Sequence, residues 1–167
     1  RKKSIITVID GCQAAPHIKI DISKINPDFY VFSGHKIYGP SGIGILYGKK
    51  DILEELNPYQ TGGEMIDYVS IQEATFAKIP NKFEAGTPNI VGAIALGAAI
   101  DFIESVGYEN IIEYESKLVN YAKESLYDLD FLNFQGKAKN KGGIFSFTIK
   151  ENKLHAHDIA TIVDQKG

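Results

Sequence analysis

Residues 31–39 read VFSGHKIYG and place a hydroxyl, an imidazole and an ammonium group within four consecutive positions. The two apolar residues at the start are typical of a buried strand, and the polar groups come where that strand would end. In open α/β sheets ligands bind outside the carboxyl ends of strands, so these groups form either an ordinary polar turn or one ligand site. At the mouth of an apolar pocket the Lys36 amine would lose hydration and become a nucleophile toward carbonyls. Ser33 and His35 could then donate hydrogen bonds to a phosphate.

The segments on either side of this stretch predict a sheet. Residues 5–9 form a continuous β-branched run, typical of a strand buried on both faces of a parallel sheet, and Asp10 follows at its carboxyl end. Asp10 is either a turn residue or a carboxylate that pairs with a buried cationic nitrogen. Gln13 lies near the same strand end. Residues 28–32 form a second strand, and residues 43–47 a third that can pair back across the Pro-Ser-Gly turn.

The rest of the chain alternates helices with short strands. Thr87-Pro88 predicts a helix start, with Thr87 as the N-cap and Pro88 at the first helical position. Thr87 is therefore either a plain cap or part of an anion site at a helix N-terminus. The other elements are expected at residues 51–56 (helix), 82–84 (strand), 88–105 and 109–127 (helices), 131–134 and 144–149 (strands), and 155–166 (a helix with Ile159, Ile162 and Val163 inward).

Composition limits the classes of function. The 167 residues are 44% hydrophobic and 23% charged with a net charge of −3, which is typical of a globular protein and argues against a nucleic-acid partner. The longest apolar stretch, residues 90–100, is too short and glycine-rich for a membrane span. Cys12 is the only cysteine, which excludes an internal disulfide and favours a reducing, cytoplasmic location.

Other residues with reactive side chains have ordinary structural interpretations. Cys12 has no base or cation beside it in the sequence and is typical of a small buried hydrophobe. His17 adjoins a proline, and His155 and His157 lack the spacing of metal ligands, so no metal site is expected. Glycines 39, 42 and 44 match no phosphate-loop pattern and are expected to form a hairpin bend.

Taken together, several motifs resemble the pyridoxal-phosphate-dependent cysteine desulfurases of the class V aminotransferase superfamily, in particular the SUF-type (type II) group that includes selenocysteine lyases. The motifs are DGCQ (10–13), FYVFSGHKIYGPSGIGILY (29–47), GGEMI (62–66), FEAGTPN (83–89) and HAHDIATIVDQKG (155–167). The resemblance covers essentially the whole chain. It implies an α/β fold in which residues 1–112 are the later part of a fold-type-I large domain, with a mixed, mostly parallel sheet. Residues 113–167 would begin a small α+β domain that is incomplete.

The resemblance also implies a role for each matching residue. Lys36 matches the lysine that forms a Schiff base with pyridoxal 5'-phosphate and acts as the catalytic base. Asp10 matches the partner of the pyridine nitrogen, and Gln13 the amide that bonds the phenolic oxygen. Ser33 and His35 match the phosphate-binding pair. Thr87 matches a contact to the phosphate of a neighbouring subunit, which implies a homodimer, and the glycines at 62 and 63 would lie near the dimer's active-site entrance.

The activity implied is conversion of L-cysteine to L-alanine, with sulfur passed to an enzyme cysteine and then to a SUF-type acceptor for iron–sulfur cluster assembly. The family's catalytic cysteine and substrate-carboxylate arginine have no counterpart in these residues, and Cys12 stands where the group usually has alanine. We therefore expect a fragment with little or no turnover by itself. Two alternatives remain: a selenocysteine lyase or other class V lyase, and a non-catalytic scaffold that retains the fold.

Overall fold

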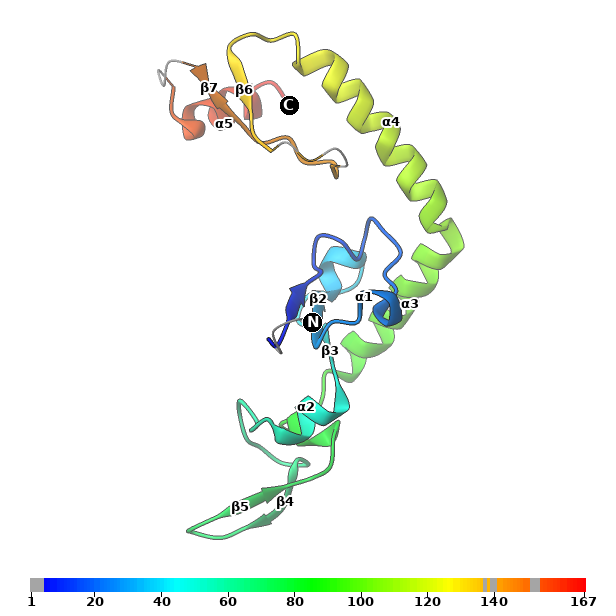
Figure 1. The fold of residues 1–167 in the computed structure, drawn as a ribbon, viewed down its shortest axis with the longest axis vertical. Coiled ribbons are helices and arrows are strands. Elements are labelled where there is room, and N and C mark those ends of the chain that lie inside the picture. The colour runs from blue at the N-terminus through cyan, green and yellow to red at the C-terminus, as the bar shows by residue number, and fades with distance from the viewer. Residues whose placement is uncertain (1–4, 137, 139–140, 151–153) are drawn as a thin grey trace. The chain divides into compact units, whose positions relative to one another are not determined.

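The computed structural model describes residues 5–136, 138, 141–150 and 154–167, and it divides the chain into two compact units, Arg1–Tyr108 and Glu109–Gly167 (Figure 1). Both contain helices and strands, as the α/β class requires. The predicted division between residues 112 and 113 falls slightly later, inside a helix. The assignment of the two parts to domains of a longer enzyme stays a prediction.

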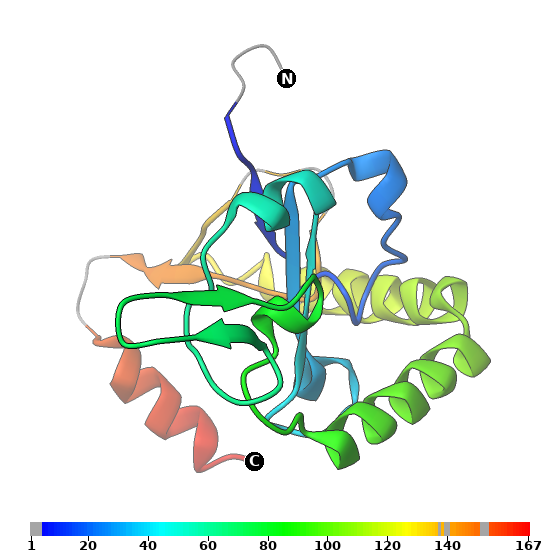
Figure 2. The same cartoon turned by 90° about the horizontal axis from the view of Figure 1, so that it is seen from below.

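A three-stranded sheet forms the centre of the first unit. Strand β1 (Val8–Asp10) pairs in parallel with β2 (Phe29–Ser33), which pairs antiparallel with β3 (Gly44–Gly48) (Figure 2). The pairing of β2 with β3 across the turn is the predicted one. Parallel pairing, expected to dominate, is confined in the described residues to β1 and β2. The predicted burial of residues 5–9 on both faces is wrong: β1 is an edge strand and its Val8 is 66% exposed.

A buried carboxylate joins the ends of all three strands on the side away from Asp10 and Ser33. Asp28 is completely buried and accepts hydrogen bonds from the Thr7 backbone N–H (2.9 Å) and hydroxyl (3.0 Å). Lys49 Nζ lies 3.4 Å from the same carboxylate. Since Thr7 precedes β1, Asp28 precedes β2 and Lys49 follows β3, this cluster fixes how the strands align.

Short helices and a hairpin complete the sheet's surroundings. Helix α1 (Ile22–Ile25) is capped by Asp21, whose side chain accepts from the N–H groups of Ser23 and Lys24, and α2 (Lys50–Glu55) follows β3. Strands β4 (Ile66–Val69) and β5 (Ala74–Phe76) form an antiparallel hairpin in a stretch for which the sequence predicted no element. The predicted strand at 82–84 is wrong: Asn81–Phe83 is a 3-10 helix, η2.

Helix α3 (Ile90–Val106) packs against the segment that follows β2. Its buried residues Gly92, Leu96, Ala99 and Ile103 recur at three- and four-residue spacing and form one inward stripe. The predicted N-cap at Thr87 is wrong. Asn89 caps the helix, because its side chain accepts a hydrogen bond from the Gly92 N–H at 2.9 Å.

The second unit follows the predicted order of helix, two strands and helix. Helix α4 (Tyr108–Leu126) begins with the last residue of the first unit. Strands β6 (Leu132–Phe134) and β7 (Phe147–Ile149) pair antiparallel, and helix α5 (Ala156–Asp164) follows them. The expectation that Ile162 and Val163 face inward is wrong, since their side chains are 54% and 59% exposed; Ile159 is half-buried.

No single helix among the described residues is long and apolar enough to cross a membrane; α3 and α4 reach the necessary length and composition only when taken together across the break between them.

Candidate active site

Polar side chains from two parallel strands meet at one edge of the central sheet. Asp10 ends β1 and Ser33 ends β2, and the register that pairs Asp10 with Val31 brings the two strand ends to the same edge. The chain then turns at once into the 3-10 helix η1 (Gly34–Ile37), which carries His35 and Lys36. Since the strands are parallel, this is the edge at which open α/β sheets bind ligands.

The Asp10 carboxylate is held in its charged form by its neighbours. Its Oδ1 accepts a hydrogen bond from the backbone N–H of Cys12 at 2.9 Å. Hydrogen bonding from Cys12 lowers the pKa of Asp10 below its ordinary value of 3.8, and the positive charge of Lys36 lowers it further. The parallel register thus places this carboxylate at the same sheet edge as the turn that carries the Lys36 amine, although the two residues are distant in sequence.

The Lys36 amine and the His35 ring are exposed, whereas the following Ile37 is buried and anchors the turn. The expectation that an apolar pocket removes water from Lys36 is therefore wrong for the described chain. The apolar residues on either side lie in the sheet or under the turn and leave the side chain itself in solvent. What sets Lys36 apart from a surface lysine is its position in the turn directly after β2, at the same sheet edge as Asp10.

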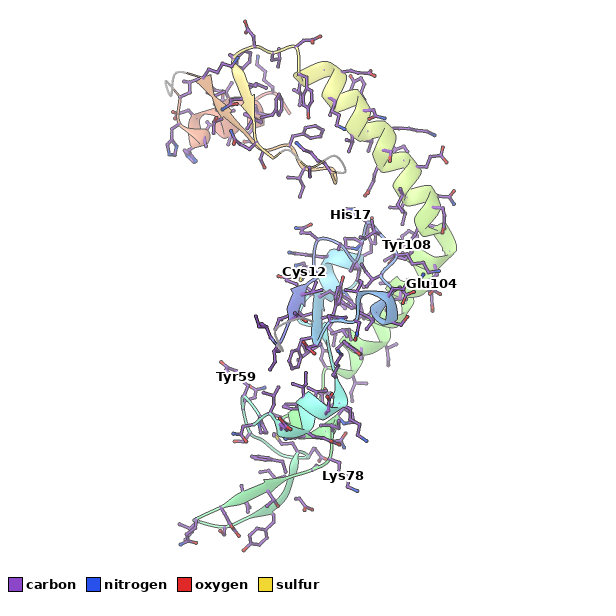
Figure 3. All side chains as sticks on the ribbon, viewed as in Figure 1. Cys12, His17, Tyr59, Lys78, Glu104 and Tyr108 are labelled. Carbon is purple, nitrogen blue, oxygen red and sulfur yellow. The ribbon has the colours of Figure 1, made fainter. Side chains whose placement is uncertain are left out.

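Cys12 lies closer to the candidate site than the sequence interpretation suggested. Cys12 is half-buried and is labelled in Figure 3. Its thiol lies 3.5 Å from Ser33 Oγ, and its backbone N–H donates a hydrogen bond to Asp10. Residues 12 and 33 are neighbours because β1 and β2 end together. No sequence pattern signalled this contact, which depends on the strand register.

A buried tyrosine supports the same strand end. Tyr30 is 4% exposed, and its hydroxyl has no hydrogen-bond partner among the described residues. A Cβ added to Gly11 would overlap this hydroxyl, so the position after Asp10 must be glycine. Burial raises the pKa of Tyr30, with a further contribution from Cys12.

Gln13 and Thr87 were also predicted to contact the cofactor. Among the described residues, no interaction joins either of them to the group around Asp10. Gln13 is exposed in the turn after β1. Thr87 is exposed and lines a separate cavity of about 830 Å³ together with Gly42 and Asn89. The segment with the glycines at 62 and 63 lies against the segment that holds Thr87, because Gly63 O accepts a hydrogen bond from the Gly86 N–H at 2.9 Å.

Two histidines and two glycines outside this group have structural roles. His155 caps α5: its Nδ1 accepts from the His157 N–H at 3.1 Å, and Asp158 accepts from the His155 N–H in return. Gly39 and Gly44 allow close backbone approach, since a Cβ on either would lie 2.9 Å from a carbonyl oxygen. No group of three or more potential metal ligands occurs in the part of the chain that the structure describes.

The chemistry of the donor set fits pyridoxal phosphate. An amine can bond an aldehyde, a carboxylate of lowered pKa can pair with a protonated ring nitrogen, and Ser33 and His35 offer hydrogen-bond donors for a phosphate. All four residues belong to the sheet edge formed by β1, β2 and η1.

Comparisons with known proteins point the same way. A family model for class-V aminotransferases matches residues 1–167. A probable cysteine desulfurase of Halalkalibacterium halodurans is 48% identical over 162 residues, which cover 97% of this chain and 39% of that protein.

Solved structures with a similar fold carry related names. The apo cysteine desulfurase of Thermococcus onnurineus NA1 has a TM-score of 0.87 and 38% identity, covering 99% of this chain and 41% of that one. A C-DES mutant with glycine covalently linked to its PLP cofactor has a TM-score of 0.76 and 27% identity, covering 92% and 40%. The chain thus spans about two-fifths of the length of these relatives.

Proposed function

The chain belongs to the class-V aminotransferase family, and on that premise we propose that the protein containing it is a cysteine desulfurase that uses pyridoxal phosphate. The observation that carries the proposal is the placement of Asp10, at the end of β1, and Lys36, in the turn after β2, at the same carboxyl edge of a parallel strand pair. A scaffold has no need of both groups at this edge, whereas the cofactor requires both an amine and a carboxylate. The names of the relatives support the choice of cysteine as the substrate.

When bound, pyridoxal phosphate supplies an electron sink for electrons released at the substrate's α-carbon. Asp10, with its lowered pKa, would remain ionised and hold a proton on the ring nitrogen. Lys36 Nζ would hold the cofactor through its aldehyde carbon, and the same amine would accept the α-proton of the substrate. Ser33 and His35 would hold the phosphate, and Gln13 the phenolic oxygen.

The further parts of the proposal concern the longer protein. Sulfur from L-cysteine would pass to an enzyme cysteine, leaving L-alanine, and then to an acceptor protein of the SUF type in the cytoplasm. Thr87 would reach the phosphate of a neighbouring subunit in a homodimer. The exposure of Thr87 supports this assignment, since the side chain is free to meet a partner. We expect residues 1–167 alone to show little or no turnover.

The test compares two matched lysine substitutions in the protein that contains this chain. Lys36→Arg keeps the charge but removes the nucleophilic amine, and Lys50→Arg makes the same change on exposed α2. We expect wild type and Lys50→Arg to gain an absorbance band near the visible edge with pyridoxal phosphate, and to release alanine from L-cysteine. Lys36→Arg should lose the absorbance band, and its rate of alanine release should fall by about a thousandfold or more.

Each alternative predicts a different result. Alanine formation at the wild-type rate by Lys36→Arg would refute the role of Lys36. Wild-type protein that gains no absorbance band would favour a non-catalytic scaffold. A faster release of selenide from selenocysteine than of sulfur from cysteine would favour a selenocysteine lyase.

A further inference from the structure

The segment that carries Lys36 is a closed loop, which we call the lysine loop (residues 34–43). Its ends are joined by a hydrogen bond from the Gly34 N–H to Ile43 O at 2.8 Å. A second bond, from the Gly39 N–H to Gly34 O at 3.0 Å, closes the turn around Lys36. Tyr38, at the exit of this turn, has a left-handed φ of 64°. A loop that includes such a residue needs support from outside to keep one conformation.

Helix α3 supplies part of that support. A Cβ on Gly39 would lie 3.0 Å from Leu96 Cδ1, so the loop backbone lies directly on the helix. The Tyr38 ring packs edge-on against Phe102 with 5.9 Å between ring centroids. Both contacts bind the middle of the lysine loop.

The second half of the lysine loop is bound by the side chain of Asn89. Asn89 Nδ2 donates a hydrogen bond to Gly42 O at 3.1 Å, while Oδ1 accepts from the Gly92 N–H at 2.9 Å. Gly92 leaves room for this amide, since a Cβ there would overlap it. Because the cap fixes Oδ1, the donor end of the amide is held toward Gly42.

We propose that Asn89 is a positioning residue that holds the lysine loop, and with it Lys36, in place at the sheet edge where β1 and β2 end. This inference rests on the proposed function only in treating Lys36 as the cofactor lysine. Asparagine is required because the residue must accept from a helix N–H and donate to a loop carbonyl at once. Aspartate is an equally good N-cap but has no donor for Gly42 O.

The test separates the loop contact from the helix cap. In Asn89→Asp the cap is kept and the bond to Gly42 is lost; Asn120→Asp, on the exposed surface of α4, makes the same chemical change elsewhere. In the protein without added cofactor, we expect Asn89→Asp to speed hydrogen exchange of the Gly34 and Gly39 amides about fivefold. The thermal midpoint should stay at that of wild type. Asn120→Asp should change neither.

A second measurement connects the loop to Lys36. With pyridoxal phosphate added, Asn89→Asp should take up the cofactor about fivefold more slowly and show a shifted pH dependence of its absorbance. The proposal would be overturned if Asn89→Asp left hydrogen exchange in the lysine loop unchanged. It would also be overturned if Asn89→Asp sped this exchange but took up the cofactor at the wild-type rate. If wild type itself takes up no cofactor, the proposed function fails, while the exchange rates still decide whether Asn89 holds the loop.

Discussion

Removing the Lys49 ammonium is expected to destabilise the first unit much more than its partly exposed position suggests. Lys49 Nζ lies 3.4 Å from the carboxylate of Asp28, which is completely buried. In Lys49→Met this carboxylate keeps its two hydrogen bonds from Thr7 but loses the ammonium group 3.4 Å away. Breaking a buried ion pair by removing one partner costs about 3–5 kcal/mol. Because the Thr7 hydrogen bonds remain, we expect about 2–4 kcal/mol.

Lys49→Met should cost much less unfolding free energy once the Asp28 carboxylate is replaced by a neutral amide. Asp28→Asn keeps an oxygen that can accept from Thr7 and removes the buried charge, so we expect a loss of about 1–2 kcal/mol. In that background Lys49→Met should add less than about 1 kcal/mol, since there is no longer a buried charge to compensate. The two substitutions should therefore be strongly non-additive.

The assay is urea unfolding at pH 7, followed by far-ultraviolet circular dichroism, for wild type, both single variants and the double variant. Lys50→Met is the matched control, because Lys50 is 78% exposed and makes only a 3.8 Å surface pair with Glu54; it should cost less than about 0.5 kcal/mol. Additivity of the Asp28 and Lys49 effects within about 0.5 kcal/mol would refute the reasoning.

Three further predictions concern the strand end that carries Asp10. Tyr30→Phe removes a buried hydroxyl that has no partner among the described residues, so the free energy of unfolding should stay the same or rise by about 1 kcal/mol; a fall of more than that would contradict the structure. Gly11→Ala should lower the free energy of unfolding by about 1–3 kcal/mol, because the new Cβ overlaps Tyr30. Gly63→Ala is the control for the lost glycine, since a Cβ there meets no described atom within 4 Å. Equal losses in the two variants would count against the overlap. The pKa of Asp10, measured by NMR titration, should lie below 3.8, so its contribution to stability is present above pH 3.8 and is lost as the pH falls through the folded-state pKa; a pKa at or above 3.8 would contradict the hydrogen bonding from Cys12.

The sequence predicted the elements with strong local patterns. The β-branched and aromatic runs around Asp10 and Ser33 gave strands, the Pro-Ser-Gly turn gave the β2–β3 pairing, and the long helices appeared where periodicity placed them. The wrong N-cap of α3 came from competition between two nearby residues that can both cap a helix. Thr87 and Asn89 are both good caps, and the choice of Asn89 depends on Gly92 and on the distant Gly42, which no local pattern reveals.

The candidate site was predictable in its residue types but not in its contacts. Asp10 and Lys36 were identified from their places after strands and from the motifs around them. The proximity of Cys12 to Ser33 and the overlap of Tyr30 with Gly11 follow from the β1–β2 register, which the sequence did not specify. The exposure of Lys36 also differed from expectation, because burial depends on which elements cover a side chain and not on its neighbours in the sequence.

The central claim is that pyridoxal phosphate bonds Lys36 at the edge where Asp10 and Ser33 meet. The most direct measurement is to load the protein with pyridoxal phosphate, reduce it with borohydride, digest it and locate the pyridoxyl mass by peptide mass spectrometry. We predict a single dominant modification on Lys36. Modification spread over exposed lysines such as Lys24 and Lys50, or concentrated on another lysine with Lys36 unmodified, would contradict the account.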